Sequence, residues 1–289
     1  MTLGKSCLHP CHGNSNRNKN DKIIVKRIDD THEELHMPDK GIESLHKMPY
    51  IFDLVNLRSI TLSHNKIRVL SPEIDKLYNL ESLNLFNNYI SELPITICNL
   101  EKLKCLNIGM NNLHTIPNGI ERLQQLEILD LSYNFLTEHS FSTEFFTLEN
   151  LRALYLSDND MEILSGEIGN LKNLQILAIR DNHLISIPEE LILLQRLREL
   201  LIQNNRIKML PPELGNMDFN SPRCQIRMEG NPFEPDLSDQ LQLGVSHVLD
   251  YIRSDIYRSR YSRYTMNPGS PPPKNEERYQ RKLLRLKGK

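Results

Sequence analysis

The sequence contains no run of 18 consecutive apolar residues, so no membrane-spanning helix is expected. Its first twenty residues are polar and rich in asparagine and lysine, without the apolar core of a secretory signal peptide. The 35 lysines and arginines nearly balance the 37 aspartates and glutamates, and the net charge of −2 does not favour nucleic acid as a partner. These absences predict a soluble, cytoplasmic protein of 289 residues.

Cysteine is also scarce, and the few that occur are scattered and odd in number, which does not fit a disulfide framework. This pattern favours a reducing compartment. The chain also lacks the cysteine-rich caps that close extracellular repeat proteins. The five positions are Cys7, Cys11, Cys98, Cys105 and Cys224.

Catalytic motifs are missing as well. The chain has no glycine-rich phosphate loop, no G-x-S-x-G turn and no H-E-x-x-H helix. Its ten histidines are dispersed among variable positions, where a surface side chain is a simpler interpretation than a general base. We therefore predict neither enzyme activity, nor a cofactor, nor a catalytic residue.

What the chain has is an internal repeat of 23 residues, with one two-residue insertion. Leucine stands eight residues before each repeated asparagine, and leucine or another apolar residue stands five and three before it and two after it. This is the leucine-rich repeat pattern LxxLxLxxNxL. The asparagines are Asn65, Asn88, Asn111, Asn134, Asn159, Asn182 and Asn205.

Each column of the repeat has a physical role. The LxL segment predicts a short strand, because period two sends both apolar side chains into the interior. The asparagine can pair with backbone groups that are buried where the chain turns away from the strand. The return half reads LPxxIxxLxxL, which predicts a short helical turn that begins near the proline. Those prolines are Pro94, Pro117, Pro188 and Pro211.

The repeats predict an α/β leucine-rich-repeat solenoid, with a parallel sheet on the concave face and helical turns on the convex face. We expect a flexible segment over 1–30, the solenoid over 31–235 and a capping helix over 236–264. The solenoid includes seven full repeats and degenerate terminal coils. The Pro-rich, basic segment 265–289 is expected to be a disordered, solvated tail, although its lysines could also touch acidic lipid or RNA.

Two segments carry metal-ligand residue types. "CLHPCHG" holds Cys7, His9, Cys11 and His12, which could bind zinc, but the spacing is irregular and the surroundings are polar. We therefore favour no metal site there.

"LRALYLSDND" could begin a calcium loop at Asp158, but such a loop needs glycine at its sixth position, which here is Ile163. Asn159 belongs to the repeat, so we interpret Asp158 and Asp160 as solvated turn residues.

The remaining candidate site is the concave face. Residues that alternate with the buried leucines should form columns across the sheet, and Tyr155 lies in mid-array between Asp130 and Arg180. Tyrosine and arginine are enriched in protein-interface hot spots. Variable residues are normal on such a face, and Asp130 with Arg180 could be only a local ion pair. We favour a partner-binding site made of Phe86, Met110, Asp130, Tyr133, Tyr155, Asp158, Arg180 and Asp181.

Several stretches are more specific than the repeat consensus. "LNLFNNYISELP", "LRALYLSDND" and "QLGVSHVLDYIRS", together with the two-residue insertion, resemble the Ras suppressor family over residues 30–260. The resemblance implies a non-enzymatic adaptor at cell-matrix (focal) adhesions that bears on Ras-dependent growth signalling. It implies binding to the fifth LIM domain of the adaptor PINCH, and through it to integrin-linked kinase and parvin, as a monomer within a larger complex. The family's concave binding residues would correspond to Asp130, Tyr155 and Arg180.

A second function stays open from the sequence. Related intracellular repeat scaffolds hold a small GTPase and a phosphatase together, so a regulatory scaffold subunit is the alternative to a LIM-binding adaptor.

Overall fold

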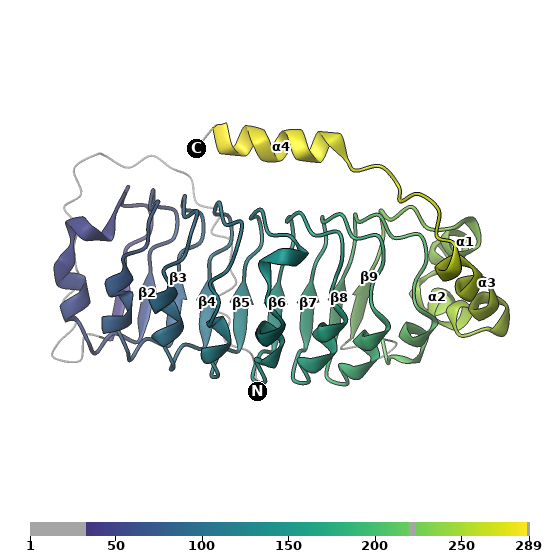
Figure 1. Cartoon of the computed structure of the whole chain (residues 1–289), viewed down its shortest axis with the longest axis horizontal. Coiled ribbons are helices and arrows are strands. Elements are labelled where there is room, and N and C mark those ends of the chain that lie inside the picture. Colours follow the sequence, from purple (N-terminus) through teal and green to yellow (C-terminus); the bar gives the residue numbers. More distant parts are fainter. Residues whose placement is uncertain (1–32, 220–223, 288–289) are drawn as a thin grey trace.

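The computed structural model describes residues 33–219 and 224–287 (Figure 1). Within these residues, nine short strands pair in parallel and in the order of the sequence. This confirms the predicted leucine-rich-repeat solenoid. The strands are β1 (Glu34–His36), β2 (Ser59–Thr61), β3 (Ser82–Asn84), β4 (Cys105–Asn107), β5 (Ile128–Asp130), β6 (Ala153–Tyr155), β7 (Ile176–Ala178), β8 (Glu199–Leu201) and β9 (Gln225–Arg227).

The return half of each coil contains a short 3₁₀ turn. The turns are η1 (Leu45–Lys47), η2 (Pro49–Asp53), η3 (Pro72–Lys76), η4 (Ile95–Asn99), η5 (Ile120–Arg122), η6 (Glu138–Ser140), η7 (Thr143–Thr147), η8 (Gly166–Asn170), η9 (Glu189–Leu193) and η10 (Pro212–Asn216). Pro94, Pro188 and Pro211 immediately precede η4, η9 and η10, as predicted. Pro117 instead lies two residues before Gly119, which has a φ of 100° and immediately precedes η5.

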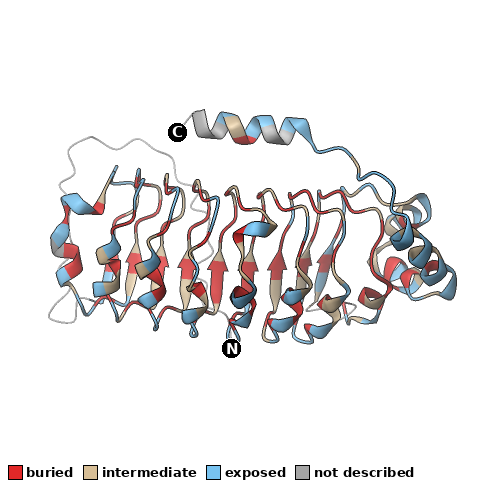
Figure 2. Cartoon of the chain, viewed as in Figure 1, coloured by how far each residue is buried: buried red, intermediate tan, exposed pale blue. Residues whose placement is uncertain are grey.

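The middle residue of each strand points into one continuous apolar core. Leu83, Leu106 and Leu129 are each buried and lie side by side in register. Buried residues recur in every coil along the array, and exposed residues lie mainly on the turns (Figure 2). Each coil is therefore covered by its neighbours, which explains why the stability of a solenoid depends on contacts between adjacent repeats.

The repeated asparagines form a hydrogen-bonded ladder. The Oδ1 atom of Asn134 accepts from Leu113 N at 3.0 Å, and its Nδ2 donates to the carbonyls of Ile108 and Leu131 at 3.0 Å. The other six predicted asparagines accept the equivalent backbone hydrogen bond through Oδ1. Asn231 adds one further rung beyond the seven repeats.

The residue before each ladder asparagine has a left-handed backbone, with φ between 54° and 58° in the seven repeats. Asparagine and aspartate tolerate this conformation, whereas a bulkier side chain is strained there by about 1–2 kcal/mol. Met110 and Tyr133 nevertheless occupy it. The positions are His64, Asn87, Met110, Tyr133, Asp158, Asp181 and Asn204.

The cap differs from the single helix that we predicted. It consists of three helices, α1 (Pro235–Leu243), α2 (Val245–Ile252) and α3 (Asp255–Met266). Gly244, with φ of 130°, separates α1 from α2, and Ser254 begins α3 by accepting a hydrogen bond from Tyr257 N. Apolar periodicity continues across both breaks, so the sequence pattern alone did not show them.

The cap closes the core by close packing of α2 on η10. A Cβ at Gly215 would lie 2.8 Å from Leu249 O, so only glycine allows this approach. From α3, the buried Tyr257 places its hydroxyl against Leu210, accepting from N at 2.9 Å and donating to O at 2.8 Å. These contacts fix the cap on the last repeat.

The C-terminal segment also differs from the disordered tail that we expected. Residues 270–275 run back over the repeats, and helix α4 (Glu276–Lys287) lies beyond the ends of the strands (Figure 1). Its contacts join residues more than 100 positions apart, which a local pattern does not reveal. The predicted flexible segment 1–30, and with it Cys7, His9, Cys11 and His12, lies outside the described residues.

A candidate protein-binding surface on the concave face

The concave face is the side of the sheet to which the first and third residues of every strand point. The third residues follow one another in register, and Tyr155 on β6 pairs with Asp130 on β5 and with Ala178 on β7. This row is as the repeat predicted. It reads Thr61, Asn84, Asn107, Asp130, Tyr155, Ala178 and Leu201.

The first residues of the strands form a second row on this face, which our prediction omitted. Together, the two rows make a central apolar patch over β5 to β8. The alternation within each LxL strand could have revealed it, because both neighbours of the central leucine point the same way. The central apolar patch consists of Ile128, Ala153, Tyr155, Ile176, Ala178 and Leu201, of which Tyr155, Ile176 and Leu201 are half-buried and the other three are buried.

Tyr155 is the largest member of the central apolar patch. Two small residues flank it, Ala153 on the same strand and Ala178 on the next, and the tyrosine itself is half-buried. Burial, followed by the charges of Glu199 and Asp130, raises the pKa of Tyr155 to about 12. The phenol is therefore neutral at physiological pH and can donate a hydrogen bond to a partner.

Asp130 borders the patch on the side of β4. Its carboxylate accepts a hydrogen bond from Ser132 N at 2.9 Å, but desolvation by burial outweighs this bond and raises the pKa of Asp130. A Cβ at Gly109 would lie 3.2 Å from Asp130 Oδ1 and 3.1 Å from Phe86 Cδ2. Glycine at this position thus leaves room for the Phe86 ring and for the Asp130 carboxylate.

The other predicted residues lie at the edge where the strands end. Arg180 is exposed, and of the described residues it is Asp181, not Asp130, that pairs with it, with Nε and Oδ2 3.8 Å apart. Asp181 also accepts from Asn204 Nδ2 at 3.0 Å. The left-handed turns hold Met110, Tyr133, Asp158 and Asp181, each partly exposed. The structure therefore brings Tyr155 and Asp130 together and leaves Phe86, on the turn after β3, farther along the array.

The concave face also has a polar hollow of about 270 Å³ between β1 and β5. Asn84, Asn107 and Asp130 line it together with Ser82 and Cys105. The face thus changes from polar over the first strands to apolar at its centre.

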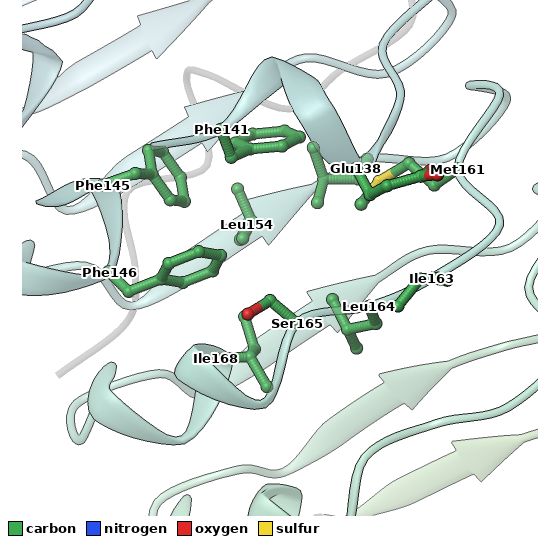
Figure 3. Close-up of a pocket in the computed structure, with 11 residues that line it drawn as sticks. Glu138, Phe141, Phe145, Phe146, Leu154, Met161, Ile163, Leu164, Ser165 and Ile168 are labelled. Atoms are coloured by element: carbon green, nitrogen blue, oxygen red, sulfur yellow. The ribbon is translucent and has the colours of Figure 1, made fainter. Parts of the chain in front are cut away.

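The two-residue insertion creates a separate apolar pocket beside η6 and η7 (Figure 3). Figure 3 shows Phe141, Phe145 and Phe146 gathered near Leu154 and Ile168. Its volume of about 20 Å³ is close to what one water needs, so it does not fit a substrate. In the repeat that carries the insertion, the phenylalanines lie in the part of the coil where most other repeats have the LPxxI segment.

The described residues contain no cluster of three or more histidine, cysteine, aspartate or glutamate side chains suited to a metal ion. In the same part of the chain, no helix combines the length and apolarity needed to span a bilayer. Asp160, which we expected to be solvated, instead accepts a hydrogen bond from Lys282 at 2.8 Å.

Comparison with known proteins agrees with this geometry. A family model described as a leucine-rich repeat region matches residues 34–161, and one described as a leucine rich repeat matches residues 196–217. Human Ras suppressor protein 1 is 58% identical over 257 residues, which cover 89% of this chain and 93% of the human protein. The chain belongs to the Ras suppressor family.

A second Ras suppressor relative extends the match. The bovine Ras suppressor protein 1 is 57% identical over 271 residues, covering 93% of this chain and 98% of the bovine protein. Family membership and the repeats together support a protein-interaction adaptor.

Solved structures share the repeat fold. A TDR receptor superposes with a TM-score of 0.61 at 25% identity, covering 70% of this chain and 35% of the receptor chain. The ectodomain of a plant membrane receptor kinase from Arabidopsis thaliana superposes with a TM-score of 0.56 at 27% identity, covering 63% and 22% of the two chains. The matched part of the present chain therefore covers about a third or less of each receptor chain.

Proposed function

We propose that this protein is a non-enzymatic adaptor whose concave face binds the fifth LIM domain of a PINCH-type partner. Through that partner it would join integrin-linked kinase and parvin at cytoplasmic cell-matrix adhesions and influence Ras-dependent growth signalling. The family membership supports the adaptor role. The observation that carries the choice of surface is the central apolar patch around Tyr155.

The chemistry of the patch suits a folded protein partner. Its centre is apolar, and polar or charged residues border it, namely Asn107 and Asp130 on one side and Glu199 and Arg180 on the other. Stable interfaces have this arrangement of a desolvated centre and a polar rim. A tyrosine held between two alanines offers a rigid anchor at little cost in conformational entropy.

The test is a titration of the full-length protein with a purified fifth LIM domain, followed by calorimetry. Loss of an aromatic hot spot costs about 2 kcal/mol or more, so Tyr155→Ala should weaken the Kd by about 30-fold or more. Tyr78→Ala is the matched control, because Tyr78 is 54% exposed between η3 and β3, away from the concave face. The control should bind like the wild type.

Arg180→Asp tests the rim of the same surface. Reversing an exposed charge should slow association and weaken binding, with a midpoint of thermal unfolding close to that of the wild type. If Tyr155→Ala and Arg180→Asp both bind as the wild type does, the concave face is not the LIM site. Recovery of a small GTPase or phosphatase without any LIM protein, in affinity purification with mass spectrometry, would support the alternative scaffold instead.

A further inference from the structure

The described part of the C-terminal segment is anchored to the edge of the solenoid where the strands end. Arg206 Nε donates to the carbonyl of Pro272 at 2.6 Å, and Lys208 Nζ donates to that of Ser270 at 3.3 Å. Lys274 pairs with Glu162 at 2.5 Å. The segment thus runs backward along the array toward the earlier repeats, and α4 continues in that direction (Figure 1).

Lys282 on α4 makes the most specific contact. It is only 4% exposed, and its ammonium lies 2.8 Å from Asp160 Oδ2 and 4.5 Å from the centre of the Phe135 ring. Lysine is almost never fully buried unless it is paired, because its charge loses hydration. Here a carboxylate and an aromatic face replace part of that hydration, as in sites that recognise a cation.

The repeats build the receiving surface from one recurring position. Phe135, Asp160, His183 and Arg206 each follow a ladder asparagine, and Glu162 lies two residues beyond Asp160. We call these five residues the edge surface. Since the ladder fixes the backbone at each position, the edge surface is rigid before anything binds to it.

Neighbouring side chains hold the edge surface in place. The Phe135 ring stacks on His114, with ring centres 5.1 Å apart and planes 15° apart. Arg206 is also buried and lies 3.3 Å from Glu162, while His183 Nε2 lies 3.9 Å from Asp160 Oδ1. The surface therefore presents an aromatic ring and two carboxylates together, which favours a cationic side chain such as that of Lys282.

The described side chains of α4 are buried on one side of the helix only. Lys282 is buried, whereas Gln280, Arg281 and Leu284 are exposed. A helix of 12 residues is marginal by itself in water, so α4 depends on its contacts with the edge surface. A terminal helix attached in this way can open without unfolding the solenoid.

We propose that the edge surface is a second binding site of this protein, specific for a lysine-bearing helix that follows a proline-rich segment. Its occupant is the chain's own segment 270–287, bound reversibly within the same molecule. The site is separate from the central apolar patch, so the proposal does not rest on LIM binding.

Hydrogen exchange of the full-length protein tests the docking. Lys282→Gln removes the charge and Asp160→Asn removes its partner, so both should speed exchange of the α4 amides at least tenfold. Glu199→Gln is the control, because it changes a carboxylate on the concave face. Tyr155→Ala should also leave α4 protection unchanged. Equal exchange in the wild type, Lys282→Gln and Asp160→Asn would overturn the proposal.

A peptide of residues 267–287 added to the full-length chain tests whether the site binds a ligand. It should bind Lys282→Gln, whose own tail is weakened, at least tenfold more tightly than the wild type. It should not bind the double variant Lys282→Gln with Asp160→Asn. No binding to Lys282→Gln, or equal binding to the double variant, would refute the site.

Analytical ultracentrifugation identifies the source of the occupant. Binding within one molecule predicts that the wild type and Lys282→Gln both sediment as monomers. A wild-type dimer that dissociates in Lys282→Gln would show that the tail comes from a second copy, against the proposal.

Discussion

The hydroxyl of Tyr257 is a single oxygen on which the docking of the C-terminal cap depends. It pairs with both backbone groups of Leu210, at 2.9 Å to N and 2.8 Å to O, and both residues are at most 1% exposed. Tyr257→Phe retains the ring and its edge contact with Tyr251, whose centre is 5.2 Å away. The substitution therefore changes hydrogen bonding with almost no change in packing.

The magnitude follows from the groups that lose their partner. An unpaired buried N–H or C=O costs about 1–3 kcal/mol, and Tyr257→Phe leaves one of each. We expect the free energy of unfolding to fall by about 2–6 kcal/mol. Because coils are stabilised by their neighbours, the loss should begin at the cap and the last repeat.

Urea denaturation followed by circular dichroism measures the total loss, and hydrogen exchange near Leu210 locates it. Tyr251→Phe is the control, since its hydroxyl makes a 3.3 Å bond to Asp236 at an exposed position. The control should change stability by no more than about 0.5 kcal/mol. If Tyr257→Phe behaves like Tyr251→Phe, the two bonds to Leu210 do not hold the cap.

Three further expectations concern the repeats. Asn134→Leu removes a rung of the ladder and should cost about 3 kcal/mol or more in urea denaturation, because several buried backbone groups lose their partner. Asn204 has φ of 54°, so Asn204→Val should be less stable than Asn204→Gly by about 1–2 kcal/mol, since both lose the same side chain and differ in backbone strain. Equal stability of the two would contradict the strain. Burial raises the pKa of Tyr155 to about 12, so the unfolded state loses this proton first and stability should fall as pH rises from about 10 to about 12. Denaturation at pH 9 and pH 11 measures this fall, and Tyr155→Phe should make it smaller.

The repeat core was predictable because its signals are local and recur in every coil. The leucines predicted the strands, and Asn134 and its equivalents predicted the ladder, since each column has one role in every coil. The row that begins each strand was predictable in principle, because Ile128, Ala153 and Ile176 alternate with the same leucines. That row precedes the first leucine of each strand, whereas the predicted columns all follow it.

Other features required the assembled molecule. The apolar period continues across Gly244 and so does not show the break between α1 and α2. In the structure α2 and α3 pack on η10, and α1 packs on α2. The partner of Arg180 also required the fold. Among the described residues, Arg180 pairs with its chain neighbour Asp181 at 3.8 Å and not with Asp130, which lies two strands away.

The sequence by itself therefore determined the solenoid, its ladder and the direction in which each strand residue points. These properties depend on neighbouring residues and on a fixed period of 23. The tertiary structure decided where the described C-terminal segment, residues 270–287, lies on the solenoid. Lys282 and Asp160 are 122 positions apart, and no periodicity relates them. Their contact exists because the finished solenoid holds Phe135 and Asp160 side by side. The Phe135 ring and the Asp160 carboxylate there stabilise the Lys282 ammonium, which has lost water on burial.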